Sequence, residues 1–98
     1  MVHKYLQSLT TVAGAAAGNL LDIDGHLYFI HIKPATATTV YKFNLTDDDS
    51  DIVLQSDWCK GTYTEKCNQI LKGSYTVNLT NATANEAFTF KMLVREYR

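Results

Sequence analysis

The densest group of chemically capable side chains is the acidic run Asp47-Asp48-Asp49-Ser50-Asp51. Carboxylates can hold Ca²⁺, whose flexible shell takes carboxylate and carbonyl oxygens. An EF-hand loop starting at Asp47 would also need Gly at its sixth position and Glu at its twelfth, where this chain has Ile52 and Trp58. Asp47, Asp49 and Asp51 stay candidate metal ligands, but we favour a solvated turn and expect no cofactor, because Asp bonds its own backbone in turns.

A second group places an aromatic ring beside a carboxylate. Trp58 follows Asp57 directly, and Tyr63 comes shortly after them. Sugar sites commonly combine an exposed aromatic ring with carboxylates, so these three residues are a candidate ligand site. A large aromatic side chain more often fills the core, and we favour that role for Trp58.

Histidines, cysteines and known catalytic motifs give no indication of an enzyme. A regular strand would place His26 and His31 on opposite faces, because their spacing is odd. The spacing of Cys59 and Cys67 fits no common zinc motif, and we favour two free thiols over a disulfide. The chain has no nucleophile elbow, phosphate-binding loop or dinucleotide fingerprint. We therefore expect a protein without catalytic residues.

Composition and charge indicate one globular domain and exclude several partners. The chain has 98 residues, of which 46% are hydrophobic and 19% charged, with a formal net charge of −1. That charge argues against nucleic-acid binding and against docking to anionic lipid. No stretch approaches the roughly 20 apolar residues of a membrane helix, and the first residues lack a signal peptide's apolar run. We expect a protein made in a cytoplasm that binds neither nucleic acid nor membrane.

From Asn19 onward, apolar residues recur with a period of two, which is typical of half-buried strands. In the clearest case, Tyr41, Phe43 and Leu45 alternate with polar residues. We expect an all-β protein, an antiparallel β-sandwich of immunoglobulin-like or jelly-roll-like type with seven to eight short strands. The expected strands cover residues 20–23, 26–33, 38–46, 52–55, 67–71, 74–80 and 88–95.

Turn signals separate these strands. Asp24-Gly25 favours a tight hairpin, because glycine accepts positive φ without steric cost, and Lys60-Gly61 and Lys72-Gly73 favour two further reversals. Pro34 cannot donate to a ladder, so a strand should stop near it. Strict alternation over residues 26–33 predicts one face with Tyr28, Ile30 and Ile32, and an opposite face with Leu27, Phe29 and His31.

The N-terminal part has a different character. Residues 13–18 read Ala-Gly-Ala-Ala-Ala-Gly, a low-complexity patch with two glycines that weaken any helix. We interpret residues 1–18 as a flexible N-terminal arm and residues 19–98 as the β-sandwich domain. The alanine and glycine patch would then connect the arm to the body.

Two runs of sequence carry a resemblance to a known class of proteins. The first is Ile30-His31-Ile32-Lys33-Pro34-Ala35-Thr36-Ala37-Thr38-Thr39-Val40-Tyr41-Lys42-Phe43, followed by Thr46-Asp47-Asp48-Asp49. The second is Leu71-Lys72-Gly73-Ser74-Tyr75-Thr76-Val77-Asn78-Leu79-Thr80-Asn81-Ala82-Thr83, followed by Phe88 and Val94-Arg95-Glu96. Together they resemble small β-sandwich structural proteins of tailed bacteriophages, which decorate or cement capsids or sit in tail assemblies. The resemblance covers residues 20–96 and implies no catalytic residues.

The resemblance implies a structural virion protein, made in the host cytoplasm, that binds itself and a major capsid or tail protein. Tyr5 and Leu6 of the expected arm, with Lys91, Arg95 and Arg98 of the last strand, are the candidate partner-binding residues. The acidic turn of one copy could meet this basic strand on the next copy. Alternatively, the basic residues simply protect an edge strand from wrong pairing. Two other functions stay open: a carbohydrate- or ligand-binding module, and a phage tail-associated protein.

Overall fold

The computed structural model describes residues 2–82 and 85–96, which form seven β-strands. No helix in this part of the chain is long and apolar enough to cross a membrane. Neighbouring strands pair antiparallel throughout. The strands are β1 (Val2–Thr10), β2 (Ala16–Pro34), β3 (Val40–Asp47), β4 (Ile52–Gln55), β5 (Cys59–Lys60), β6 (Tyr63–Thr80) and β7 (Ala87–Glu96).

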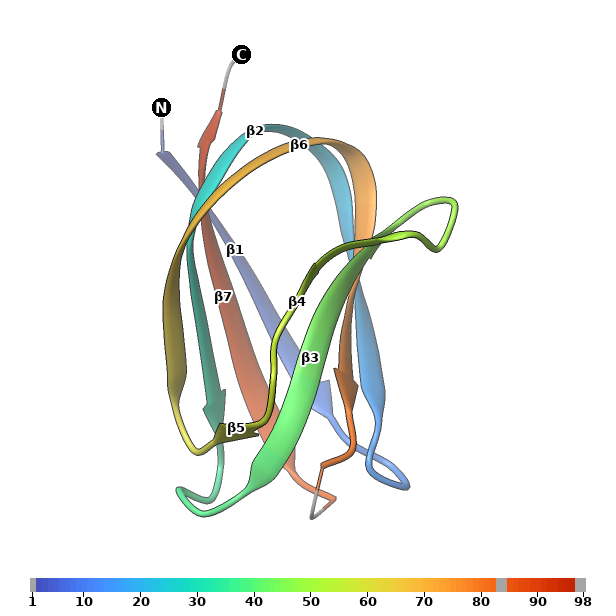
Figure 1. The fold of residues 1–98 in the computed structure, drawn as a ribbon, viewed down its shortest axis with the longest axis vertical. Helices are drawn as coiled ribbons and strands as arrows, with labels where there is room; N and C mark the ends of the chain where they lie inside the picture. The colour runs from blue at the N-terminus through green and yellow to red at the C-terminus, as the bar shows by residue number, and fades with distance from the viewer. Residues whose placement is uncertain (1, 83–84, 97–98) are drawn as a thin grey trace.

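Two long strands organise the fold. β2 and β6 pair along almost their whole length and arch together across one end of the molecule (Figure 1). On one side of the arch β2 pairs with β7, which pairs with β1. On the other side β6 pairs with β3, which pairs with β4 and β5. The strand order β1-β7-β2-β6-β3-β4 thus folds over into two layers, which confirms the predicted antiparallel β-sandwich.

We call the two halves the first and the second layer. The first layer contains β1, β7, residues 25–34 of β2 and residues 63–71 of β6. The second layer contains residues 16–20 of β2, residues 75–80 of β6, and the strands β3 and β4.

The core lies between the layers. Tyr41 of β3 meets Phe88 of β7 across the interior, edge to face, with ring centroids 5.1 Å apart. The predicted alternation holds on both strands, because Phe43 and Leu45 share the buried side with Tyr41, and Phe90 is buried on the same side as Phe88. Strand positions that face the interior are therefore filled by large apolar groups, and positions that face outward are mostly polar.

Within the first layer, β2 departs from strict alternation at one position. Leu27 pairs with Val94 while Phe29 pairs with Leu93, so Tyr28 is an extra residue, a β-bulge. The bulge turns Leu27 and Ile30 to the same buried side and leaves Tyr28 and Phe29 half-buried outside. The face assignment expected for residues 26–33 therefore holds for Ile30 and Ile32 against Phe29 and His31, and is wrong for Leu27 and Tyr28.

The same bulge also reverses the expectation for the histidines. His26 pairs with Arg95 and His31 with Lys91, two residues of β7 at an even spacing. Residues that pair directly across strands point to the same side. His26 and His31 thus share the outer face of the first layer, at opposite ends of the bulged segment.

Gly25 does not form the predicted hairpin turn. It lies inside β2, near the arch, where β7 ends against the bend. A Cβ at this position would collide with the carbonyl oxygen of Arg95 and lie 2.7 Å from a methyl group of Val94. Gly73, opposite Ile23, has φ of 111° and also lies inside a strand. Gly25 therefore marks a close approach of β7, and Gly73 marks a bend with positive φ; both lie within a continuous ribbon and not in a hairpin turn.

The N-terminal segment is a paired strand, which corrects the expectation of an arm. β1 pairs with β7 over all nine of its residues, from Val2 opposite Arg95 to Thr10 opposite Ala87. Ala13 and Gly14 have φ of 55° and 83°, and Val12 and Ala15 exchange backbone hydrogen bonds around them. This tight turn leads from the first layer directly into the second.

Other predicted turns are confirmed. β2 ends at Pro34, and Gly61, with φ of 68°, lies in the connection between β5 and β6. The acidic run connects β3 to β4, with the amide of Ser50 donating to the carbonyl of Asp47 at 3.0 Å. The strand boundaries expected for residues 52–55 match β4.

A polar network ties together three connections at the end opposite the arch. The Glu86 carboxylate accepts hydrogen bonds from the Thr39 hydroxyl and, at 2.7 Å, from the amide of Thr36. The Glu86 amide donates to the Thr11 hydroxyl at 2.9 Å. Thr11 and Thr39 are buried, so these contacts satisfy polar groups that water does not reach.

Candidate functional site

The strongest candidate site is an open hollow beside Trp58. The hollow has a volume of about 390 Å³ and is lined by Lys42, Gln55, Ser56 and Asp57. Trp58 is 57% exposed, which overturns the preferred role of a core side chain. An exposed large aromatic ring next to a polar hollow is a typical element of ligand sites.

The β3–β4 hairpin positions these residues. Asn44 pairs with Gln55, and the amide of Ser56 donates to the carbonyl of Phe43 at 2.9 Å, which continues the pairing by one residue. The amide of Phe43 donates in return to the Ser56 hydroxyl at 3.0 Å. The chain then leaves the sheet, and Asp57 accepts the amide of Trp58 at 2.9 Å. Lys42 and Gln55 therefore flank the hollow from neighbouring strands.

Lys42 holds the indole ring in place. Its Nζ lies 4.5 Å from the centroid of the Trp58 ring, a cation–π contact. Asp57 contributes a negative charge to the same hollow, while Gln55 and Ser56 are neutral. The hollow thus offers a cation, a carboxylate, an amide and a hydroxyl, and the Trp58 ring adjoins it through its contact with Lys42.

Tyr63 does not join this site. It is half-buried on β6, with its ring 5.4 Å from Phe43, and its hydroxyl donates to the Glu65 carboxylate. Burial raises the pKa of Tyr63 above its usual range, and the bond to Glu65 raises it further. Of the three residues proposed from sequence, the structure brings together Asp57 and Trp58 and separates Tyr63 from the lining of the hollow.

The two cysteines are free thiols in this structure, Cys59 buried and Cys67 half-buried. Burial raises the pKa of both, that of Cys67 to about 11, and the nearby Glu65 carboxylate adds to the effect. Both thiols are therefore protonated at neutral pH and poor nucleophiles.

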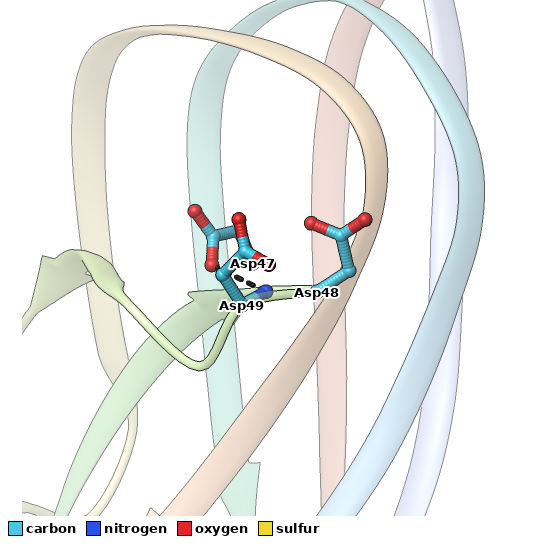
Figure 2. Close-up of side chains that lie close together, drawn as sticks. All are labelled: Asp47, Asp48 and Asp49. Carbon is cyan, nitrogen blue, oxygen red and sulfur yellow. Dashed lines mark hydrogen bonds between the residues drawn. The ribbon is translucent and has the colours of Figure 1, made fainter.

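The acidic turn brings its carboxylates together. Asp47, Asp48 and Asp49 have carboxylate oxygens within 4.8 Å of one another (Figure 2). One oxygen of Asp47 accepts the amides of Asp49 and Asp51, both at 2.9 Å, which is the expected aspartate turn. The carboxylates that lie together are therefore those of Asp47, Asp48 and Asp49, and not the predicted set of Asp47, Asp49 and Asp51. The bonds of Asp47 account for the order of the turn without a metal.

The partner-binding residues expected from sequence have different environments. Leu6 is 57% exposed and pairs with Lys91, while Tyr5 is half-buried with its hydroxyl 2.5 Å from Glu96. Lys91 and Arg95 lie on β7, between β1 and β2, so they do not protect an edge strand. Arg98 lies outside the described residues.

Lys42, Gln55 and Ser56 are site residues that sequence reasoning missed. A signal for them was available, because the acidic turn fixes a hairpin and counting outward from it places Lys42 near Asp57. A group of polar side chains next to the hollow is also brought together only by the fold. On the outer face of the second layer, the Asn78 amide donates to Asn44 at 2.9 Å, and Thr46 and Thr76 lie beside them.

Comparisons with known proteins support the fold. A comparison with models of protein families gives no match, and one with curated protein sequences gives none either. Among solved structures, the chain is similar to the C-terminal CBM6 of LamC, a marine laminarinase from Zobellia galactanivorans, with a TM-score of 0.50 and 10% identity over 97% of this chain and 100% of that one. At this identity the likeness concerns the fold alone.

Two further structures are more distant. The enzymatically active domain of tailspike protein 4 of bacteriophage CBA120 has a TM-score of 0.38 and 15% identity, over 93% of this chain and 15% of that one. The structure of the infectious bursal disease virus Gx strain has a TM-score of 0.35 and 11% identity, over 100% of this chain and 32% of that one. The likeness to the CBM6 structure supports a β-sandwich, the architecture that the strand pairing shows directly.

Proposed function

We propose that this chain is a non-catalytic binding module and that its Trp58 site binds a neutral oligosaccharide. The observation that carries the proposal is the exposure of Trp58 beside a hollow that offers an amide, a hydroxyl and a carboxylate. A sugar ring presents an apolar C–H face to an aromatic ring and hydroxyl groups to polar side chains. The likeness to a CBM6 adds only a fold-level analogy, since one fold hosts many functions.

The surroundings of the hollow favour a neutral ligand. Lys42 and Asp57 contribute opposite charges to it, so neither an anion nor a cation is favoured overall. The neighbouring outer face carries Asn44 and Asn78, whose amides are suited to hydroxyl groups. A saccharide longer than one unit would extend from the hollow onto these amides.

The test uses the intrinsic fluorescence of Trp58, the one tryptophan of the chain. A glycan array identifies candidate neutral oligosaccharides, and titration of each one follows the emission of the indole. We expect a saturable change in the wild type and loss of binding, measured by calorimetry, in Trp58→Ala. The matched control is Ile70→Ala, which removes another exposed apolar side chain, on the first layer, and should leave binding unchanged. Equal affinity in Trp58→Ala, or no neutral glycan that shifts the emission, would refute the proposal.

A second candidate function, a structural virion protein of a tailed phage, is favoured by a different observation. β1 is the edge strand of the first layer, and its side chains Val2 and Leu6 are exposed. Exposed apolar groups on an outer strand suit assembly with a shell or tail protein. In that role the chain would be located in the virion, in many copies.

Genome context discriminates between the two functions. Neighbouring genes for a major capsid protein or a portal would support the virion protein. Neighbouring genes for polysaccharide-degrading enzymes, with no phage structural genes, would refute it and leave the binding module.

A further inference from the structure

The outer face of the first layer is basic across all four of its strands. Pairing places Lys4, Leu93, Phe29 and Lys66 in one row across β1, β7, β2 and β6. The other basic residues project to the same side of the layer, because they pair with or alternate with members of that row. We call the following five residues the basic face: Lys4, Lys33, Lys66, Lys91 and Arg95.

The basic face contains more than half of the nine lysines and arginines of the chain. Within the outward residues of the four described segments 2–8, 26–33, 64–70 and 89–95, none is acidic. The face therefore concentrates positive charge although the chain as a whole has a formal net charge of −1. Such segregation is invisible in the composition.

Aromatic rings of the bulged segment support two of these cations. The Nζ of Lys91 lies 5.9 Å from the centroid of the Phe29 ring, and the guanidinium of Arg95 lies 5.6 Å from that of Tyr28. Cation–π contacts restrict the motion of long side chains. The β-bulge that turns both rings outward thus helps to fix the positions of the charges.

The opposite charge is concentrated on the acidic turn, residues 47–51. Asp48, Asp49 and Asp51 are exposed, and the connection between β3 and β4 projects from the body of the molecule beside the arch (Figure 1). Asp47 fixes the shape of the turn through its bonds to two backbone amides. The turn is therefore a compact anionic projection with a defined backbone.

One copy of the chain cannot bring these two surfaces together. The acidic turn connects two strands of the second layer, whereas the basic face is the outer side of the first layer, and the core separates them. We propose that the acidic turn of one copy docks on the basic face of a second copy. The contact is heterologous, so it repeats from copy to copy and yields a ring or an open filament.

This self-association does not depend on the Trp58 site. Its strength should fall as the salt concentration rises. The charges on both surfaces are exposed, and exposed pairs are screened beyond about 10 Å at 0.1 M ionic strength and beyond about 3 Å at 1 M. We expect sedimentation velocity to show concentration-dependent association in low salt and a monomer at about 1 M NaCl. Association that is unchanged by salt, or a monomer at every concentration in low salt, would overturn the proposal.

Two charge variants and their mixture provide the decisive test. The first variant combines Asp48→Lys with Asp49→Lys, which takes the formal charge of the turn from −4 to 0. The second combines Lys33→Glu with Lys66→Glu, which takes the formal charge of the basic face from +5 to +1. Each variant alone loses most of the attraction at every contact and should associate at least about tenfold more weakly than the wild type. A mixture of the two keeps one wild-type contact, the turn of the second variant on the face of the first, and should form one-to-one pairs.

The matched control compares two single variants with the same change in net charge, Lys66→Glu inside the basic face and Lys60→Glu on β5, an exposed position outside it. Lys60→Glu should associate like the wild type, and Lys66→Glu more weakly. Circular dichroism establishes that each variant keeps the β fold. Failure of the mixture to associate, when each variant is folded and monomeric, would overturn the proposal. Binding of polyphosphate to the basic face without any self-association would instead assign the face to a polyanion and equally overturn it.

Discussion

The two faces of β7 have different roles, one in the core and one at the surface, although their residues alternate along one strand. Phe88, Phe90 and Met92 point into the core and are almost fully buried, whereas Lys91 and Arg95 point outward and belong to the basic face. The inward residues determine whether the layers pack, and the outward residues determine what the surface presents. Composition averages the two sides, so it hides both the segregation of charge and the exposed Trp58.

The largest effect should follow from a change on the inward side. Phe90→Ala removes a ring with no exposed surface and leaves a cavity between the layers, so we expect a loss of about 3–5 kcal/mol in the free energy of unfolding. The outward neighbour provides the comparison, because Lys91→Ala loses only a half-exposed cation–π contact of below about 1 kcal/mol. Urea unfolding measures both. Similar losses for the two variants would contradict the division between the sides.

A smaller effect is expected at the arch, where space rather than burial is limiting. Gly25→Ala adds a methyl group against the carbonyl of Arg95 and the side chain of Val94. We expect a loss of about 1–3 kcal/mol, the usual cost of overpacking. Thermal unfolding measures it, with Lys72→Ala, exposed on the same arch, as the control. A neutral Gly25→Ala would show that β7 can move away from the ribbon.

A pH-dependent effect is expected at the end opposite the arch. The hydroxyl of Thr39 and then the amide of Thr36 hold the pKa of the Glu86 carboxyl below its usual range. A lowered pKa in the folded state stabilises the fold above the unfolded pKa of about 4.3, and this contribution is lost as pH falls through the folded value. Glu86→Gln should therefore lower Tm at pH 7, and the difference in Tm between Glu86→Gln and the wild type should become smaller at acidic pH.

The control for Glu86 is Asp48→Asn, which alters an exposed carboxylate outside the polar network. It should leave the pH profile of Tm close to that of the wild type. A Tm difference for Glu86→Gln that stays constant from neutral to acidic pH would argue against the ionised carboxylate as the cause.

The smallest effect on stability is expected at Trp58. Trp58→Ala removes an exposed ring held by one cation–π contact, so the free energy of unfolding should change by less than about 1 kcal/mol. In the wild type, iodide should quench the indole emission readily, because the ring is open to solvent. A loss comparable to that of Phe90→Ala, or a shielded emission, would contradict the placement of Trp58 outside the core.

The inward pattern could be predicted from the sequence wherever a strand is regular. Tyr41, Phe43 and Leu45 alternate without interruption, and β3 carries no bulge between them. The prediction failed where a distant contact decides the local structure. Gly25 has the sequence of a turn but lies inside a strand, because β7, far along the chain, approaches it there. The bulge at Tyr28 likewise depends on pairing with Val94 and Leu93, which no local period reveals.

The candidate site was predictable only in part, for a related reason. Asp57 and Trp58 are neighbours in sequence and were found together, whereas Lys42 reaches them through hairpin pairing. The size of Trp58 predicts a place in the core, but Trp58 lies two residues beyond Ser56, where the chain has left the sheet, and its side chain is exposed. The N-terminal strand was missed because its partner, β7, lies at the other end of the chain.

The sharing of β2 and β6 between both layers has a consequence for the opening of the molecule. Because β2 and β6 run through both layers, unfolding of either layer removes part of the two strands on which the other is built. Backbone amides of the β2–β6 ladder within the first layer should exchange with deuterium mainly through global unfolding, while β1 and β4, at the ends of the strand order, can fray separately. The protein should therefore behave as one cooperative unit with two peripheral strands that open first.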